Sequence, residues 1–209
     1  MFTQSTISLL GLLRRCKTVP VVENRAQFAH IFDSPHILAL LLRHCNLFEL
    51  RDLLEQAHRR DLAVYVNADH IHGVHADAAG LRYLASQCHV AGVVSNHPKI
   101  LALAKSFGLE TIQRIFAVDS TGLEMALESV DGANTDLLEI SPALVIPYVI
   151  PSLVSPLPLP FIGSGLIQTT QQIHAILRAD AAGVVVARST LWRNPLVDDG
   201  KVLSSLAAY

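Results

Sequence analysis

Short apolar runs rich in β-branched residues alternate along this chain with longer amphipathic segments, and this alternation constrains the fold more than any other feature. The runs that we predict as strands are Thr18–Val22, His36–Leu40, Leu62–Asn67, Ala91–Ser95, Thr111–Val118, Asp136–Ile140, Leu159–Gly163 and Gly183–Ala187. Helices are predicted between them, among them Leu50–Arg60, Ala76–Gln87, Pro98–Phe107, Thr121–Val130 and Thr169–Arg178. Because the runs are apolar on both faces, they are typical of a parallel sheet covered by helices.

Eight strand–helix units is the number that closes a barrel. We therefore predict an α/β fold, a compact (β/α)8 TIM-type barrel of parallel strands, formed by residues 1–209 as a single domain. A typical barrel of this kind has about 250 residues, so the loops here must be short. An open doubly wound sheet is the main competitor, but it would need fewer strands and would leave unpaired edges.

The composition excludes several classes of protein. Only 16% of the 209 residues are charged and the net charge is −2, which disfavours a disordered chain, a coiled coil and a polybasic nucleic-acid or membrane binder. Three cysteines without a CxxC pair indicate a reducing compartment. Met1–Leu13 lacks the basic start of a signal peptide. We therefore expect a cytoplasmic protein.

An uncharged stretch follows the sixth predicted strand. No Lys, Arg, Asp or Glu occurs between Glu139 and Arg178, yet six prolines interrupt the stretch, so we predict that it is buried and does not cross a membrane. Within it, Ala143–Val154 is rich in large apolar residues. Because contiguous exposed apolar surface usually marks an interface, we predict a homo-oligomer that forms through this segment.

The ends of the last two predicted strands indicate a phosphate site. Gly163-Ser164-Gly165 ends the seventh strand in a glycine-rich turn, and Arg188-Ser189 follows the eighth. Barrels often bind phosphate between these two loops, because glycine lets backbone N–H groups approach an anion closely. Serine hydroxyls and the arginine would add donors and charge. The alternative is a tight turn that merely needs glycine.

Four motifs carry a resemblance to a known family. They are the runs V-N-A-D-H-I-H-G from Val66, G-L-E-T-I-Q-R-I-F-A-V-D-S from Gly108, D-L-L-E-I-S-P from Asp136, and P-F-I-G-S-G-L-I from Pro160, with a closing Leu191-Trp192. Together they resemble the glycerol-3-phosphate responsive antiterminator family over about Leu9 to Trp192. The T-I-Q-R block is the most specific of them.

The resemblance implies a compact barrel that senses glycerol-3-phosphate, binds a leader mRNA and lets transcription pass a terminator in a glycerol-utilisation operon. It implies no catalysis and no cofactor. Asp69 and Glu139, with Asp119 as a further candidate, would bind the glycerol hydroxyls. Gln113 and Arg114 alternate along one strand, so only one faces the barrel interior. A buried Arg114 would need a carboxylate partner, for which Glu139 on the neighbouring strand is the candidate.

Other interpretations stay open. The family pattern has basic residues where this chain has Val22 and Ser95-Asn96-His97, so a sensor of another phosphorylated metabolite without RNA binding is possible, as is a sugar-phosphate isomerase or lyase. Asp69, His70, His72 and His75 could instead bind a metal ion. For RNA, residues 1–60 carry a net +3, from eight Lys or Arg against five Asp or Glu. The basic excess lies on Arg14, Arg15, Lys17, Arg43, Arg51, Arg59 and Arg60.

Overall fold

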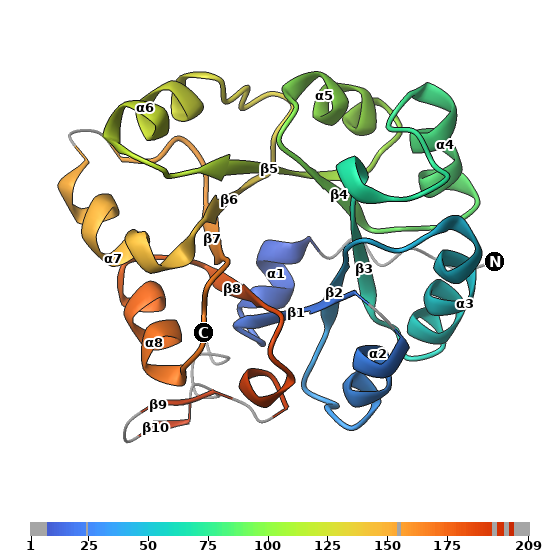
Figure 1. The fold of residues 1–209 in the computed structure, drawn as a ribbon, viewed down its shortest axis with the longest axis horizontal. Helices are drawn as coiled ribbons and strands as arrows, with labels where there is room; N and C mark the ends of the chain where they lie inside the picture. The colour runs from blue at the N-terminus through green and yellow to red at the C-terminus, as the bar shows by residue number, and fades with distance from the viewer. Residues whose placement is uncertain (1–7, 24, 154–155, 194–195, 199–200, 203–209) are drawn as a thin grey trace.

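Eight parallel strands close into a barrel in the computed structural model, which describes residues 8–23, 25–153, 156–193, 196–198 and 201–202 (Figure 1). The strands are β1 (Thr18–Val22), β2 (Ala39–Leu42), β3 (Ala63–Asn67), β4 (Gly92–Ser95), β5 (Glu110–Phe116), β6 (Leu137–Ser141), β7 (Phe161–Ser164) and β8 (Gly183–Val186). Pairing of β1 with β8, in which Thr18 lies opposite Val184, closes the ring. The predicted TIM-type barrel is confirmed.

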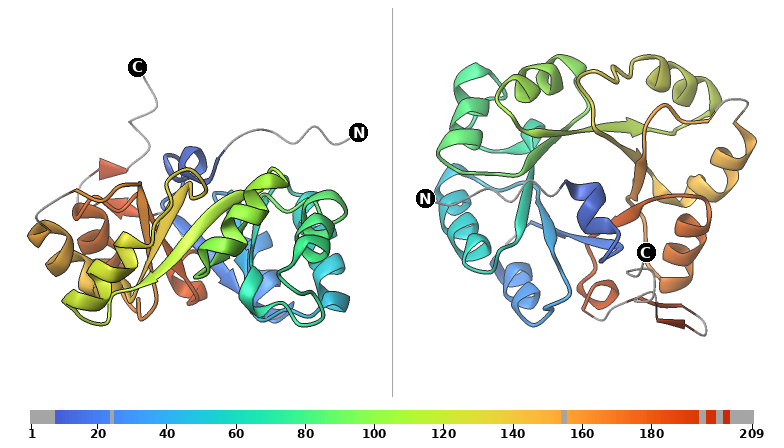
Figure 2. Two further views of the ribbon diagram at one scale, coloured as in Figure 1. Left: turned by 90° about the horizontal axis from the view of Figure 1, so that it is seen from above. Right: turned by 180° about the vertical axis from the view of Figure 1, so that it is seen from behind.

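Helices α2 to α8 surround the ring of strands and α1 lies over one end of it, as the views from three directions show (Figures 1 and 2). They are α1 (Leu9–Leu13), α2 (Arg25–Phe32), α3 (Leu47–His58), α4 (Ala78–Ser86), α5 (Pro98–Ser106), α6 (Ser120–Glu128), α7 (Ile146–Val149) and α8 (Thr170–Arg178). Short 3-10 turns are η1 (Ala68–His70), η2 (Ala143–Val145), η3 (Ile150–Ser152) and η4 (Ser189–Leu191), and a hairpin pairs β9 (Val197–Asp198) with β10 (Lys201–Val202).

Side chains at the N-caps fix where the helices begin. Thr169 and Gln172 form the capping box of α8, so the helix begins at Thr170, one residue after the predicted start. Helix α6 differs from its predicted start, because the carboxylate of Asp119 accepts the Gly122 N–H and caps the helix one residue before Ser120. A carboxylate at this position also interacts favourably with the helix dipole.

Alternation of side chains along the strands produces two cores. Residues such as Val21, Leu41 and Ile162 fill the barrel interior, and the residues between them pack against the outer helices. Helix α1 covers the amino-terminal end of the barrel and adds Leu9 and Leu13 to the interior core (Figure 1). The mouth at the carboxyl ends of the strands remains for the functional site.

Strand β2 differs from its prediction in a way that matters for the site. The sequence-based strand was His36–Leu40, whereas β2 spans Ala39–Leu42 and pairs residue for residue with β3 from Ala39 opposite Ala63. The pairing with β3 therefore places the end of β2 at Leu42, two residues after the predicted end at Leu40. Arg43 directly follows β2 and so lies at the mouth of the barrel.

The uncharged segment Ala143–Val154 mostly packs against its own chain. It forms η2, α7 and η3, in which Ala143 and Ile146 are buried and Tyr148 is 78% exposed; Val154 lies outside the described residues. Much of the apolar surface that suggested an interface is thus packed against other parts of the same chain. The homo-oligomer stays a prediction. Among the described residues, no helix is long and apolar enough to cross a membrane.

Candidate functional site

Three charged side chains meet at the carboxyl end of the barrel. The Glu139 side chain on β6 is fully buried, and its Oε1 accepts hydrogen bonds from Arg114 Nε at 3.1 Å and Arg114 Nη2 at 2.7 Å. Arg114 lies opposite Glu139 in the β5–β6 register, so the partner proposed from strand alternation is confirmed. Arg43 approaches from β2 on the other side of the ring, with its Nη2 3.6 Å from the same oxygen. We call these three residues the charged layer.

The charged layer carries a net positive charge, because two guanidinium groups share one carboxylate. Burial and the charge of Arg114 lower the pKa of Arg43, and the carboxylates of Glu139 and Glu23 oppose this shift. Near it, the imidazoles of His44 and His70 lie 5.0 Å apart between ring centres. Excess positive charge in a partly buried mouth attracts an anion more strongly than the same charge in water does.

Three buried polar atoms in this region have no hydrogen-bond partner among the described residues: Arg43 Nε, Asn67 Nδ2 and Glu139 Oε2. Asn67 ends β3, and its Oδ1 accepts the Asp69 N–H at 3.1 Å, which fixes the orientation of the amide. Buried polar atoms in folded proteins are nearly always hydrogen-bonded. These atoms are therefore the ones that a polar ligand would pair.

The loop after β7 supplies backbone donors beside the charged layer. Gly165 and Leu166 both adopt positive φ angles, of 84° and 60°. Neither N–H group donates a hydrogen bond within the described part of the chain. A Cβ on Gly165 would approach Ser141 Oγ, at the end of β6, to 2.9 Å. This tight turn therefore has two successive amides without an acceptor among the described residues, and anions bind to successive N–H groups of this kind.

The neighbouring glycine has a different role from the one that the sequence suggested. A Cβ on Gly163 would meet Ile146 Cδ1 at 2.8 Å and Ile176 Cγ2 at 3.0 Å. Both isoleucines belong to the outer core, where they are fully buried. Gly163 therefore lets α7 and α8 pack closely on β7, and its α-carbon faces away from the mouth. Ser164, the next residue, is buried at the end of β7.

The carboxylates predicted to bind hydroxyl groups lie at the same rim but have other partners. Asp69 Oδ1 accepts the Ser95 hydroxyl at 2.7 Å and its Oδ2 accepts the Asn96 N–H at 3.1 Å, so it connects the loops after β3 and β4. Asp119 is exposed and caps α6. Glu139 alone of the three predicted carboxylates belongs to the charged layer.

The predicted phosphate cradle is only partly assembled. The capping box uses the N-cap and N3 amides of α8, since Thr169 Oγ1 accepts the Gln172 N–H and Gln172 Oε1 accepts the Thr169 N–H. The side chain of Arg188 is exposed and has no hydrogen bond or ion pair within the described residues, and Ser189 begins the three-residue η4. The donors left for the cradle include the loop after β7 and the side chain of Arg188.

The histidines after β3 do not gather into a metal site. No group of three His, Cys, Asp or Glu side chains in the described ranges is placed to hold a metal ion. His70 faces His44 instead, and its pKa is lowered by burial and by the nearby His44, against the opposing charge of Asp69.

The basic residues near the amino terminus have several different surroundings. Arg43 belongs to the mouth, and Lys17 donates to the Ala182 carbonyl oxygen at the opposite end of the barrel. Arg59 pairs with Glu55 on α3, and Arg60 stacks on the Phe32 ring. Arg15, Arg51 and Arg59 line one open groove, and the predicted RNA-binding patch stays a prediction.

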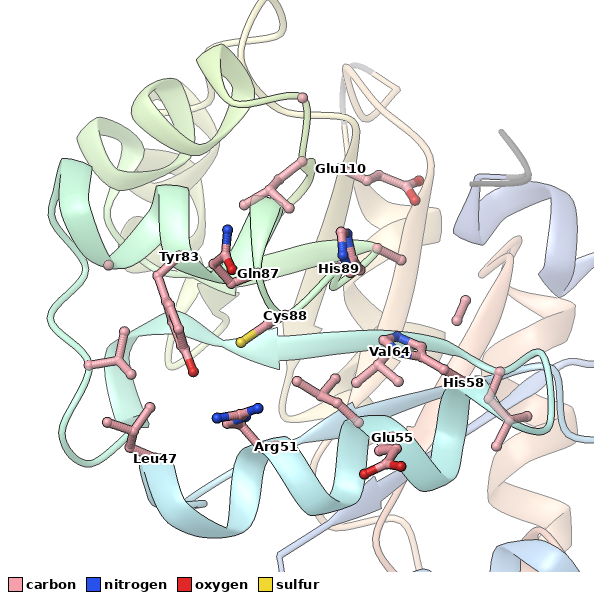
Figure 3. A pocket seen from close by; sticks show the side chains of 18 of the residues that line it. Leu47, Arg51, Glu55, His58, Val64, Tyr83, Gln87, Cys88, His89 and Glu110 are labelled. Atoms are coloured by element: carbon pink, nitrogen blue, oxygen red, sulfur yellow. The ribbon is translucent and has the colours of Figure 1, made fainter. Parts of the chain in front are cut away.

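An open groove of about 2140 Å³ lies outside the mouth. It runs along α3 and α4 and reaches α1 and the start of β5. Figure 3 shows Arg51 of α3 opposite Tyr83 of α4, with Cys88 between the two helices. Burial raises the pKa of the Cys88 thiol, so this cysteine is not an activated nucleophile.

Sequence reasoning missed Arg43 and Asn67. Arg43 was counted with the solvent-exposed basic residues because the second strand was ended at Leu40. The unbroken apolar run from Ile37 to Leu42 was the signal that could have placed it, since a charge directly after a buried strand lies at the strand end. Asn67 was recognised at a strand end but was given no role.

Comparisons with known proteins identify a family and related barrels. A family model described as glycerol-3-phosphate responsive antiterminator matches residues 18–192. A glycerol uptake operon antiterminator regulatory protein from Listeria monocytogenes is structurally similar, with a TM-score of 0.76 and 20% identity over 85% of this chain and 95% of that one. No curated protein sequence matches the chain.

Two further solved structures share the fold. An antiterminator-related protein from Thermotoga maritima has a TM-score of 0.74 and 20% identity over 86% of this chain and 99% of its own. A deoxyribose phosphate aldolase from Aeropyrum pernix has a TM-score of 0.63 and 14% identity over 89% and 91% of the two chains. Such low identities establish the barrel and nothing about the chemistry.

Proposed function

The chain belongs to the family of glycerol-3-phosphate responsive antiterminators, and from this premise we propose that it is a transcription regulator that senses glycerol-3-phosphate and binds a leader mRNA. The charged layer is the observation that carries the ligand part of the proposal. Two guanidinium groups around one buried carboxylate leave a positive charge at the mouth of the barrel. A phosphate monoester has the opposite charge and can also use the free amides of Gly165 and Leu166.

The residues at the mouth favour binding over catalysis. Lys17 contacts a carbonyl at the amino-terminal end of the barrel, Lys99 is on α5, and Lys105 pairs with Asp136. None of these lysines lies at the carboxyl end of a strand, where an aldolase of this fold would need one to form a Schiff base. The likeness to an aldolase is therefore one of fold.

Calorimetry tests ligand binding directly. We expect saturable binding of glycerol-3-phosphate, with glycerol and inorganic phosphate binding at least tenfold more weakly, because each lacks half of the required contacts. Gly165→Glu should abolish binding through steric block and charge repulsion. Gly132→Glu is the matched control, since a side chain at Gly132 meets no atom within 4 Å. Equal binding of inorganic phosphate alone, or no binding of any of the three, would contradict the proposal.

RNA binding and terminator read-through are tested in assays of their own, apart from the calorimetry of ligand binding. In a transcription assay on a template with a glycerol-operon leader, glycerol-3-phosphate and the protein together should increase read-through. Ligand binding with no effect on read-through and no RNA binding would indicate a metabolite sensor without RNA. Turnover of triose or pentose phosphates by the purified protein would indicate an enzyme instead.

A further inference from the structure

The unpartnered polar atoms at the mouth point to a specific chemical group in the ligand. Arg43 Nε and Asn67 Nδ2 are hydrogen-bond donors without an acceptor, and Glu139 Oε2 is an acceptor without a donor. Asn67 is 1% exposed and Glu139 is fully buried. Leaving such a group unpaired costs about 1–3 kcal/mol, and more when it is charged. Three unpaired atoms in one small region therefore indicate a binding surface.

The three side chains lie close to one another although they come from different strands. Arg43 Nη2 is 3.6 Å from Glu139 Oε1, which brings β2 and β6 together across the mouth. Leu42 pairs with Val66 in the β2–β3 register, so the next residues, Arg43 and Asn67, are neighbours on adjacent strands. We call Arg43, Asn67 and Glu139 the polar floor.

Only some ligand groups can satisfy the polar floor. A phosphate dianion offers acceptors alone and cannot donate to Glu139 Oε2, whereas an ammonium group offers donors alone and cannot accept from Arg43 Nε or Asn67 Nδ2. A hydroxyl both donates and accepts, so one or two hydroxyl groups can donate to Glu139 Oε2 and accept from Arg43 Nε and Asn67 Nδ2.

A water molecule below the charged layer is the simpler explanation for Glu139 Oε2. Glu139 also lines an interior void of about 10 Å³, at the lower limit for one water. The other side chains around the void are apolar, apart from Tyr65, whose hydroxyl already donates to Glu110 Oε2. A buried water needs two to four polar partners, so this void offers too few.

We propose that the polar floor recognises the hydroxyl groups of a phosphorylated polyol and so selects it against phosphate esters that lack them. This inference rests on the proposed function, in which the loop after β7 binds the phosphate group. Arg43 and Asn67 become specificity-determining residues, and Glu139 has two roles: one oxygen holds Arg114 and Arg43, and the other accepts a ligand hydroxyl.

A ligand series on the unmodified protein tests the inference. Calorimetry compares glycerol-3-phosphate, 3-hydroxypropyl phosphate, which lacks the secondary hydroxyl, and propyl phosphate, which lacks both hydroxyls. We expect affinity to fall at each step and about 30-fold or more in total, because each lost hydroxyl leaves a buried polar atom unpaired. This series requires no variant to fold.

Variants then assign the effect to the polar floor. Arg43→Lys keeps the charge but loses the Nε–H group, and Asn67→Leu removes the amide donor. Both should reduce the ratio of glycerol-3-phosphate affinity to propyl phosphate affinity at least fivefold. Arg59→Lys is the matched control, because this arginine is exposed on α3 and pairs with Glu55. It should change neither affinity.

The outcomes separate this inference from the proposed function. Propyl phosphate that binds as tightly as glycerol-3-phosphate would overturn the role of the polar floor and leave an anion sensor standing. A strong hydroxyl preference that survives both variants unchanged would also overturn it. If none of the three phosphate esters binds, the proposed function fails and this inference fails with it.

Discussion

Gly163 and Gly165 are two residues apart in one turn, yet they face different parts of the molecule. Gly165 has a φ of 84° and adjoins Ser141 at the mouth, whereas Gly163 is in a strand and adjoins two isoleucines of the outer core. A glycine-rich motif in a sequence therefore combines two needs, a left-handed backbone and a close packing contact. Replacing each glycine by alanine tests these two needs separately.

Gly165→Ala should reduce both stability and ligand affinity. A left-handed conformation costs a residue with a Cβ about 1–2 kcal/mol, and the added carbon also approaches Ser141 Oγ to 2.9 Å. Chemical denaturation measures the loss. Gly108→Ala is the control, with a φ of 79° and no atom within 4 Å of its new Cβ, so it should show the backbone cost alone. Equal losses at the two positions would argue against the contact with Ser141.

Gly163→Ala should reduce stability and leave ligand affinity unchanged. Overpacking of a well-filled core costs about 1–3 kcal/mol, and here the new Cβ would meet Ile146, Ala143 and Ile176 at 2.8–3.0 Å. Denaturation and calorimetry on the same variant provide both readouts. A large loss of affinity at unchanged stability would restore the binding role that the motif suggested.

Local sequence predicted some residue roles and not others. Strand alternation was enough to pair Arg114 with Glu139, because both lie on adjacent predicted strands and a buried arginine requires a carboxylate. Arg43 was missed because its position depends on where β2 ends, and the pairing with β3 determines that end. Asp119, a further candidate for binding hydroxyls, caps α6, because a carboxylate after a strand can equally well cap the following helix; its role toward a ligand stays a prediction.

At the scale of elements, α1 is held over the amino-terminal end of the barrel by one partly buried carboxylate. Glu110 accepts the Leu9 N–H with Oε1 at 3.0 Å and Oε2 at 2.9 Å, and the Tyr65 hydroxyl donates to Oε2 at 2.5 Å. Burial nevertheless raises the pKa of Glu110, because the hydrogen bonds from Tyr65 and Leu9 only partly compensate for desolvation of the charge.

Glu110 should therefore give the protein a measurable pH dependence. With a pKa above the ordinary 4.5, the folded chain binds this proton more tightly than the unfolded chain does. Stability then decreases as the pH rises from about 4.5 through the raised pKa. Glu110→Gln should remove this slope in denaturation curves recorded between pH 4 and 7, whereas the exposed Glu124→Gln should retain it. A slope that persists in Glu110→Gln would show that another group is responsible.

The elements themselves were largely predictable. Thr18–Val22 was predicted with its observed bounds, and Pro98 begins α5 as expected for a proline in a first helical turn. The region from Ala143 to Ser152 was not predictable in the same way, because three short turns replace the helix that a (β/α)8 unit normally contains. Prolines at 147 and 151 remove hydrogen bonds that a longer helix would need.

At the scale of the whole molecule, the predicted homo-oligomer now depends on a smaller surface. In the segment from Ala143 to Leu153, Tyr148 is the large apolar residue that remains strongly exposed. We expect an oligomer in sedimentation velocity at micromolar concentration, and Tyr148→Glu should shift it toward monomer. Phe48→Glu on α3, where Phe48 is 88% exposed, is the control and should not. A monomer in the unmodified protein would end this prediction.

The last prediction concerns the coupling between the mouth of the barrel and RNA. The chain has a net charge of −2, and Arg43, Arg59 and Arg60 each have a partner within the chain, so electrostatic attraction alone gives little RNA affinity. A regulator of this kind therefore needs the ligand to increase RNA affinity, and thermodynamic linkage then requires RNA to increase ligand affinity by the same factor.

Two independent titrations measure this factor. Fluorescence anisotropy of a labelled leader RNA, with and without saturating glycerol-3-phosphate, provides one ratio of dissociation constants. Calorimetry of glycerol-3-phosphate, with and without saturating RNA, provides the other. We expect both ratios to agree and to lie in the range of about 5 to 150 that is typical of allosteric proteins. Ratios of one in both titrations would mean that the ligand and RNA do not communicate, because a ligand that binds two states equally well shifts neither.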